Sequence, residues 1–228
     1  MGAFDFAVIQ RALPFLWKGL QYSVQLTLTA MAGGIVLGTL LAMMRLSSHR
    51  VLNLPATVYV NGIRSIPLVL VIFWFYFLVP LILQSVMGAS SPVHVGPEKS
   101  ALVTFIMFEA AYYSEIMRAG IQSVSRGQVS AAYALGLTYF QSMAQVILPQ
   151  AFRNMIPILL TQTIVLFQDT SLVYVLSITD LLGAAVKTAQ RDGRLVEMYV
   201  FVALIYFFLS YTLSTLVKQL QQRVAVIR

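Results

Sequence analysis

The sequence has 228 residues, of which 59% are hydrophobic and 10% are charged, and its mean hydropathy is +0.81. Because a soluble domain carries roughly a quarter charged residues, this composition excludes a soluble globular domain and indicates a polytopic membrane protein. The formal net charge of +7 comes from basic residues spread between apolar segments, which indicates contact with anionic lipid headgroups and no nucleic acid partner.

The first 18 residues mix aromatic and basic side chains, including Phe4, Arg11, Trp17 and Lys18. This pattern fits two structures. One is a helix lying in the membrane surface, and the other is a frayed start of the first membrane span.

Five segments are apolar over about 20 residues, the length that crosses a bilayer as a helix. They are residues 22–44, 58–87, 101–121, 156–178 and 196–217. We therefore expect an all-α membrane protein in which residues 1–228 form a single transmembrane domain. An odd number of spans places the two termini on opposite sides.

The basic residues near the span ends indicate the orientation, because cytoplasmic loops are enriched in Lys and Arg. Nine lie on one side and six on the other. The nine are Arg45, Arg50, Arg64, Arg118, Arg126, Arg153, Lys218, Arg223 and Arg228. This bias predicts an external N-terminus, a cytoplasmic C-terminus and a cytoplasmic loop at about 125–150.

The second apolar segment begins with an arginine and a proline, Arg64 and Pro67. Counted from the expected interface, Arg64 lies about 10 Å deep. A guanidinium at that depth needs a carboxylate or must reach back to water. We predict a structural ion pair between Arg64 and Glu115 of the third segment, with Glu109 facing a cavity; the alternative is that Arg64 extends to the interface.

The fourth segment carries Asp169, flanked by Gln168, Thr170 and Ser171. A carboxylate about two-thirds of the way across the bilayer must be paired or face water. These residues either contact a transported substrate or tie helices together.

The stretch from Ser125 to Pro157 is polar but not rich enough in charge, Gly or Pro for a disordered linker. Small residues up to Gly136 predict a short helix that ends near this glycine. Such a helix between membrane spans is suited to docking another protein.

The sequence contains no GxxxxGK[ST], HExxH or GxSxG motif, no spaced Cys/His set and no cysteine. It therefore predicts no ATP site, metal centre or catalytic nucleophile on this chain. Transport fits better than catalysis. Five spans are too few for the two repeats of a secondary transporter, so we expect a second copy or a relative to complete the pathway.

Four motifs together resemble the membrane subunits of ATP-binding-cassette (ABC) importers, in the polar amino acid permease family. They are RSIP at Arg64, YYSEIMRAGIQSVSRGQ from Tyr112, SAAYALG from Ser130 with Leu148-Pro149 after it, and QDTSLVYVLS from Gln168. The resemblance covers almost the whole chain. It implies the type I importer fold, with about five transmembrane helices and a cytoplasmic coupling helix.

In that family the coupling helix enters a cleft on a separate ATPase. The matching residues here are Ser130, Ala131, Ala132, Leu135, Gly136 and Leu137. The resemblance places ATP and Mg on that ATPase and no cofactor on this chain. Ser130 departs from the family's usual glutamate, which removes a charged contact.

The resemblance is greatest to the subgroup that imports glutamate and aspartate, and Gln168 replaces a lysine that relatives often carry. It implies an inner-membrane protein with a related second permease subunit, two ATPase copies and a periplasmic amino acid binding protein. An amino acid needs an acceptor for its ammonium and donors for its carboxylates. The candidates are Arg64, Glu109, Gln162, Gln168, Asp169, Thr170 and Ser171.

Two other functions are compatible with a membrane bundle that has a docking loop. One is a non-transporting assembly or scaffold protein that binds a cytoplasmic partner. The other is an ion channel, but the sequence lacks the ring-like filter or charge series that a channel needs.

Overall fold

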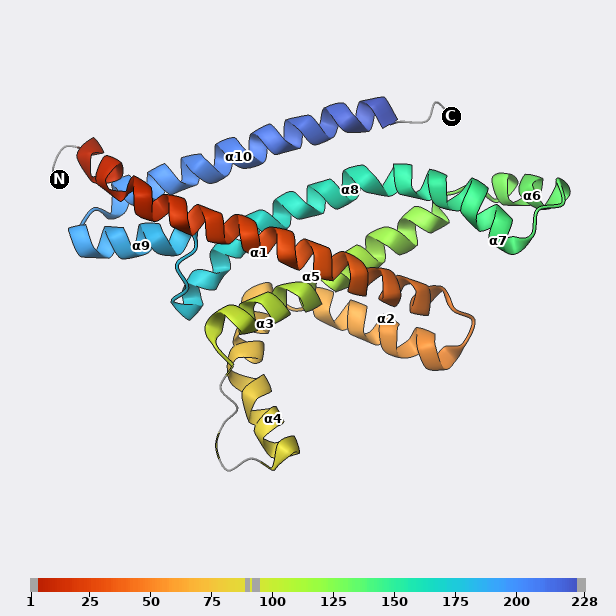
Figure 1. The fold of residues 1–228 in the computed structure, drawn as a ribbon, viewed down its shortest axis with the longest axis horizontal. Helices are drawn as coiled ribbons and strands as arrows, with labels where there is room; N and C mark the ends of the chain where they lie inside the picture. Colours follow the sequence, from red (N-terminus) through yellow and green to blue (C-terminus); the bar gives the residue numbers. More distant parts are fainter. Residues whose placement is uncertain (1–3, 89–90, 92–94, 225–228) are drawn as a thin grey trace.

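The structure, a computed structural model, describes residues 4–88, 91 and 95–224, and all their regular elements are helices (Figure 1). This confirms the predicted all-α membrane class. Helices suit a membrane because each satisfies its own backbone polar groups. Among the described residues, four helical runs are long and apolar enough to cross a membrane: Phe6–Leu46, Leu68–Met87, Tyr139–Leu176 and Leu195–Arg223. The helix α5, Pro97–Gln122, covers the third predicted span, residues 101–121, and its Glu109 and Glu115 make it less apolar.

The helix α1 runs without interruption from Phe6 to Leu46 and has 41 residues. The side chain of Asp5 caps it by accepting a hydrogen bond from the Ala7 N–H at 2.9 Å. Its first turns pack through Val8, Ala12 and Leu16 against the last two helices of the chain. Residues 6–18 are therefore an ordered helical extension of the first span and not a frayed start, while their location in the membrane surface stays a prediction.

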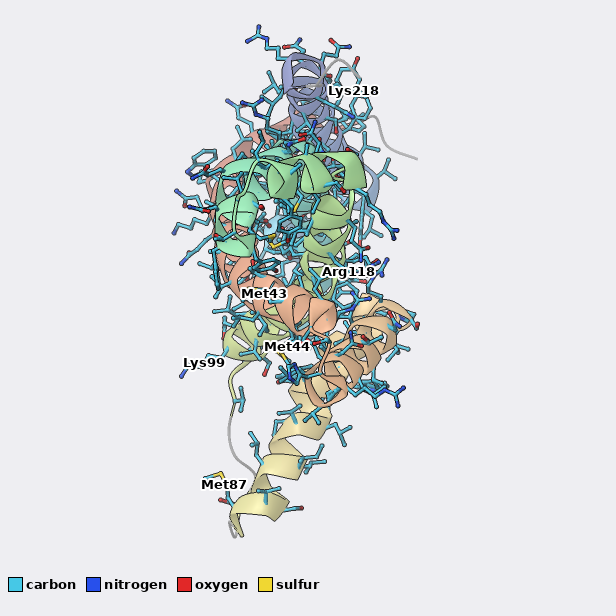
Figure 2. All side chains as sticks on the ribbon, turned by 90° about the vertical axis from the view of Figure 1, so that its right-hand side faces the viewer. Met43, Met44, Met87, Lys99, Arg118 and Lys218 are labelled. Carbon is cyan, nitrogen blue, oxygen red and sulfur yellow. The ribbon has the colours of Figure 1, made fainter. Side chains whose placement is uncertain are left out.

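The predicted start of the second span, near residue 58, is wrong because the chain breaks ahead of Leu68–Met87, the part that is long and apolar enough to cross a membrane. The helix α2 (Arg50–Arg64) ends at Ser65, and after Pro67 the chain continues as α3 (Leu68–Phe73), a π-helical turn (Trp74–Leu78) and α4 (Val79–Met87). A proline disfavours helical backbone at the residue before it, so the helix ends ahead of Pro67. α4 then projects away from the other helices, with Met87 at its end (Figures 1 and 2).

Helices α1 and α5 pack closely because α1 presents glycines to α5. A Cβ atom on Gly38 would lie 2.9 Å from the Ala110 carbonyl oxygen, and one on Gly34 would lie 3.0 Å from the Tyr113 ring. Small residues let membrane helices approach at backbone distance. This contact fixes the position of α5 beside α1.

The second half of the chain supplies the two ends of the molecule. Its elements in order are α6 (Arg126–Ala134), α7 (Tyr139–Ser142), a π-helical turn (Met143–Ile147), α8 (Leu148–Asp169), a 3-10 turn (Thr170–Leu176), α9 (Leu181–Asp192) and α10 (Leu195–Val224). α6 and α7 lie at the opposite end from α9 (Figure 1). Figure 2 looks onto the end with α6, where Arg118 and the end of α1 with Met43 and Met44 also lie.

The start of α9 is anchored on α1. The buried Asp180 carboxylate accepts hydrogen bonds from the N–H groups of Leu182 at 3.0 Å and Gly183 at 2.8 Å. Burial raises the pKa of the Asp180 carboxyl to about 6, against the effect of these hydrogen bonds. The Leu181 N–H donates to Ser23 on α1 at 3.2 Å. Asp180 therefore both caps α9 and sits against the first span.

We expect Gly19→Ala to destabilise the protein, because the new Cβ would lie 2.5 Å from the Asp180 carbonyl oxygen. Overpacking of this kind costs about 1–3 kcal/mol. Gly62→Ala in α2 is the matched control, since a Cβ there has no heavy atom within 4 Å. Thermal unfolding in detergent should show a lower Tm for Gly19→Ala alone. Equal Tm values would contradict the close α1–α9 contact.

Candidate functional site

A cavity of about 490 Å³ lies between the α2–α3 break, α5 and α8. It combines a cation, a carboxylate, an amide and an aromatic ring, which are Arg64, Asp169, Gln162 and Tyr112. The other lining residues are Ser65, Ile66, Pro67, Leu68, Phe108, Val165 and Leu172. Polar groups of opposite charge that converge on a mostly apolar cavity are typical of a small-molecule site.

The helix break places Arg64 at this cavity. Arg64 is the last residue of α2, and Pro67 precedes the first residue of α3. The guanidinium carbon lies 5.4 Å from the centroid of the Tyr112 ring, a distance suited to a cation–π contact. The side chain of Arg64 is 37% exposed, so it is open to a ligand from the cavity.

Glu109 does not line the cavity, which corrects the expectation that it faces one. It is 0% exposed, and both of its carboxylate oxygens accept from the Gln162 side-chain nitrogen, at 3.2 and 3.3 Å. Glu109 therefore orients Gln162, and Gln162 lines the cavity. The sequence places these two residues 53 positions apart, and only the packing of α5 on α8 brings them together.

Glu115 lies among three arginines. Arg45 of α1 approaches its carboxylate at 2.5 Å and Arg64 at 3.7 Å, and Arg118 on the next turn of α5 also pairs with it. The predicted Arg64–Glu115 pair is thus the loosest of three contacts. Sequence reasoning missed Arg45 and Arg118, although the spacing of three residues between Glu115 and Arg118 is a helical pairing pattern.

The remaining residues of the predicted substrate set do not reach this cavity. Gln168 and Ser171 line a second hollow of about 390 Å³ against α10, together with Tyr206 and Ser210. Thr170 is fully buried, and its hydroxyl donates to the Phe167 carbonyl at 2.7 Å. Since neighbouring helical residues point about 100° apart, Asp169 is the member of this run that faces the cavity.

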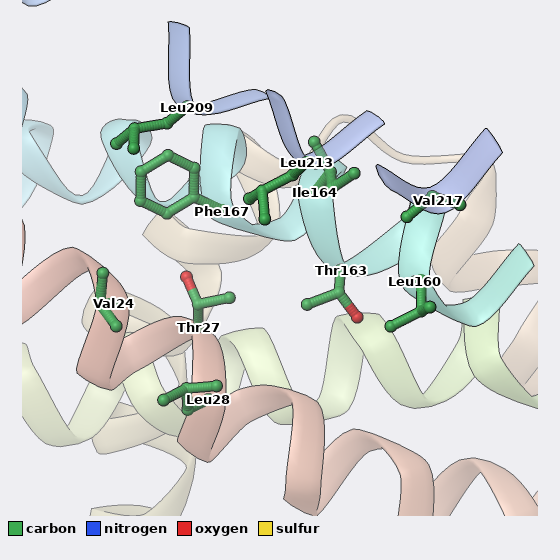
Figure 3. Close-up of a pocket in the computed structure, with 10 residues that line it drawn as sticks. All are labelled: Val24, Thr27, Leu28, Leu160, Thr163, Ile164, Phe167, Leu209, Leu213 and Val217. Atoms are coloured by element: carbon green, nitrogen blue, oxygen red, sulfur yellow. The ribbon is translucent and has the colours of Figure 1, made fainter. Parts of the chain in front are cut away.

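A third hollow, of about 300 Å³, lies between α1, α8 and α10 (Figure 3). Its lining is apolar except for Thr27 and Thr163. Both hydroxyls donate to carbonyl oxygens of their own helices, those of Ser23 at 2.8 Å and Leu159 at 2.9 Å. It therefore offers no group that could bind a charged ligand.

The predicted docking helix is α6, which Ser125 caps through a hydrogen bond from the Gln128 N–H at 3.4 Å. Ser130 and Ala131 are exposed, and Leu135 is 81% exposed. Gly136 has a φ of 79°, a conformation that favours glycine, and it turns the chain after the helix.

Two members of the predicted docking set differ from the expectation. Ala132 is only 3% exposed and Leu137 is half-buried, so Ala132 packs on its own chain and is not available to a partner. Three aromatic side chains that the sequence reasoning left out are exposed beside Leu135. They are Tyr133, Tyr139 and Phe140. Aromatic residues in a polar stretch between spans were the signal that could have identified them.

Comparison with known proteins identifies one family. The family described as "Binding-protein-dependent transport system inner membrane component" matches residues 34–226. The glutamate/aspartate import permease protein GltK of Escherichia coli O6:H1 is 55% identical over 225 residues, which cover 99% of this chain and 100% of that protein. The glutamine transport system permease protein GlnP of Escherichia coli K12 is 30% identical, over 98% of this chain and 99% of that protein.

Solved structures have the same fold. An amino acid ABC transporter determined with histidines superimposes with a TM-score of 0.88 at 30% identity, over 98% of this chain and 100% of that chain. The MetNI methionine ABC transporter, at 18% identity and a TM-score of 0.71 over 99% of this chain and 100% of that chain, shares the fold.

We expect Gln162→Leu to destabilise the protein, because it leaves the buried Glu109 carboxylate without its hydrogen-bond donor. A buried polar group left unpaired costs about 1–3 kcal/mol, and more when it is charged. Gln168→Leu is the matched control, since that side chain is exposed on the same helix. Thermal unfolding of both variants checks this, and a larger loss of Tm for Gln168→Leu would contradict it.

Proposed function

Because the chain belongs to the family of inner-membrane components of binding-protein-dependent transport systems, we propose that it is the permease subunit that imports glutamate and aspartate. The observation that carries this proposal is the 55% identity to a glutamate/aspartate import permease over the full length of both proteins. The family makes this chain the non-catalytic membrane component of the transporter.

The cavity chemistry supports an amino acid as the substrate. Arg64 can donate to a carboxylate in the paired geometry that guanidinium groups favour. Asp169 and the Tyr112 ring can hold the ammonium group. Gln162 donates its N–H to Glu109, so its carbonyl oxygen is left to accept from the ammonium. Arg45 and Arg118 behind Arg64 add positive charge, which favours an acidic over a basic amino acid.

The complete importer would contain this chain and a related second permease subunit, with a periplasmic binding protein outside and two ATPase copies inside. ATP and Mg would bind to the ATPase. The N-terminus would lie in the periplasm and the C-terminus in the cytoplasm, as the basic residues indicate. The ATPase would alternate the permease pair between outward-facing and inward-facing states.

Transport by the complete complex in proteoliposomes tests the substrate. With ATP inside and the binding protein outside, we expect uptake of labelled glutamate that excess aspartate inhibits and excess lysine does not. The reason is that lysine would place a second cation near Arg64. ATPase activity stimulated equally by acidic and basic amino acids would contradict the proposed substrate class.

Thiol labelling tests the orientation and the docking of α6 in one experiment, because the chain has no cysteine of its own. We expect Ser130→Cys to react with a membrane-impermeant maleimide in inside-out vesicles only, and bound ATPase to slow the reaction by about tenfold or more.

Gln190→Cys, on the exposed face of α9, is the control and should react from the outside regardless of the ATPase. Labelling of Ser130→Cys from the outside would overturn the orientation. Equal labelling rates with and without ATPase would overturn docking at α6.

A further inference from the structure

Arg64 lies between the cavity and the ion cluster, which Glu115 forms with Arg45, Arg64 and Arg118. It contacts one residue of α5 on each side, Tyr112 in the cavity lining and Glu115 in the cluster. Its guanidinium lies 3.7 Å from the Glu115 carboxylate and 5.4 Å from the Tyr112 ring centroid. Tyr112 and Glu115 are one turn apart on α5. Any displacement of α5 relative to α2 therefore changes both contacts of Arg64 at once.

Within the ion cluster, Glu115 binds Arg64 less closely than it binds Arg45 and Arg118. Arg45 lies 2.5 Å from Glu115 and its side chain is 8% exposed, whereas Arg64 is at 3.7 Å and 37% exposed. With Arg118, three positive charges share one negative charge, so the four side chains carry a net charge of +2. A carboxylate in the cavity can compete with Glu115 for Arg64, because Glu115 keeps its other partners.

The same helix connects this cluster to α6. The end of α5 is fixed on α8, since the Asn154 amide donates to the Ser123 hydroxyl at 2.7 Å and Gly120 packs directly on Met155. Val129 of α6 packs into the apolar cluster that also holds Met117 of α5. A displacement of α6 therefore passes into the last turns of α5, where Glu115 lies.

We propose that Glu115 is a positioning residue that controls whether Arg64 is available to the substrate. When α6 moves, α5 moves with it, and Glu115 takes the guanidinium from the substrate carboxylate, which lowers the affinity of the cavity and favours release. This inference rests on the proposed transport function. It adds a physical connection between the docking helix and the cavity.

Three variants in the reconstituted complex test this inference. Glu115→Gln removes the charge that competes with the substrate for Arg64. The half-saturating concentration of glutamate should therefore fall about two- to fivefold, the range for a partly exposed ion pair. The maximal rate should also fall, because release is slower. Glu115→Asp should shift both values less and in the same direction, and it serves if Glu115→Gln fails to assemble. Glu98→Gln, an exposed carboxylate at the start of α5, should leave both values unchanged.

The split between the two kinetic values separates positioning from a merely structural role. A lower maximal rate with an unchanged or higher half-saturating concentration, in both Glu115 variants, would overturn the inference. Failure of the unmodified complex to transport glutamate would overturn the proposed substrate instead. The α-carboxylate is common to all amino acids, so the same comparison then applies to the amino acid that the complex does transport.

Discussion

A carboxylate inside a membrane bundle is costly unless cations surround it, and the structure meets this requirement for Glu115 with arginines from three helices. Arg45 lies in the last turn of α1, Arg64 is the last residue of α2, and Arg118 lies on α5 one turn after Glu115. The ends of α1 and α2 are thereby held against one point of α5. The break after Arg64 follows from Pro67, and the cluster holds Arg64 beside the cavity that the break opens.

Two further contacts keep α5 in the position that the ion cluster needs. The glycines of α1 bring the two backbones close, which places Arg45 within reach of Glu115. On the other side, Gln162 of α8 binds the buried Glu109. α5 thus makes polar side-chain contacts with α1 and α2 through Glu115 and with α8 through Glu109. Because of its polar residues, α5 is the least apolar of the expected spans and forms the structural centre of the bundle.

The sequence was sufficient for the membrane class, four of the span locations and the helix α6, because these depend on hydropathy and on local turn residues. It was not sufficient for the start of the second span. The apolar run from 58 to 87 is continuous, so hydropathy alone does not reveal that Pro67 separates two helices with different directions. Assignment of the cavity residues failed for a related reason. Gln168 and Asp169 are adjacent in sequence and point into different hollows, and the pairing of Glu109 with Gln162 requires the register between two helices.

The length of α1 has a mechanical consequence. At 1.5 Å per residue its 41 residues extend about 60 Å, roughly twice the thickness of the hydrocarbon core. Its first turns pack on α9 and its last residue but one is Arg45 in the ion cluster. After Pro14 no proline interrupts it, so it can act as a stiff rod. A tilt of α1 imposed at one membrane face would then displace its other end at the opposite face, without a series of intermediate side-chain rearrangements.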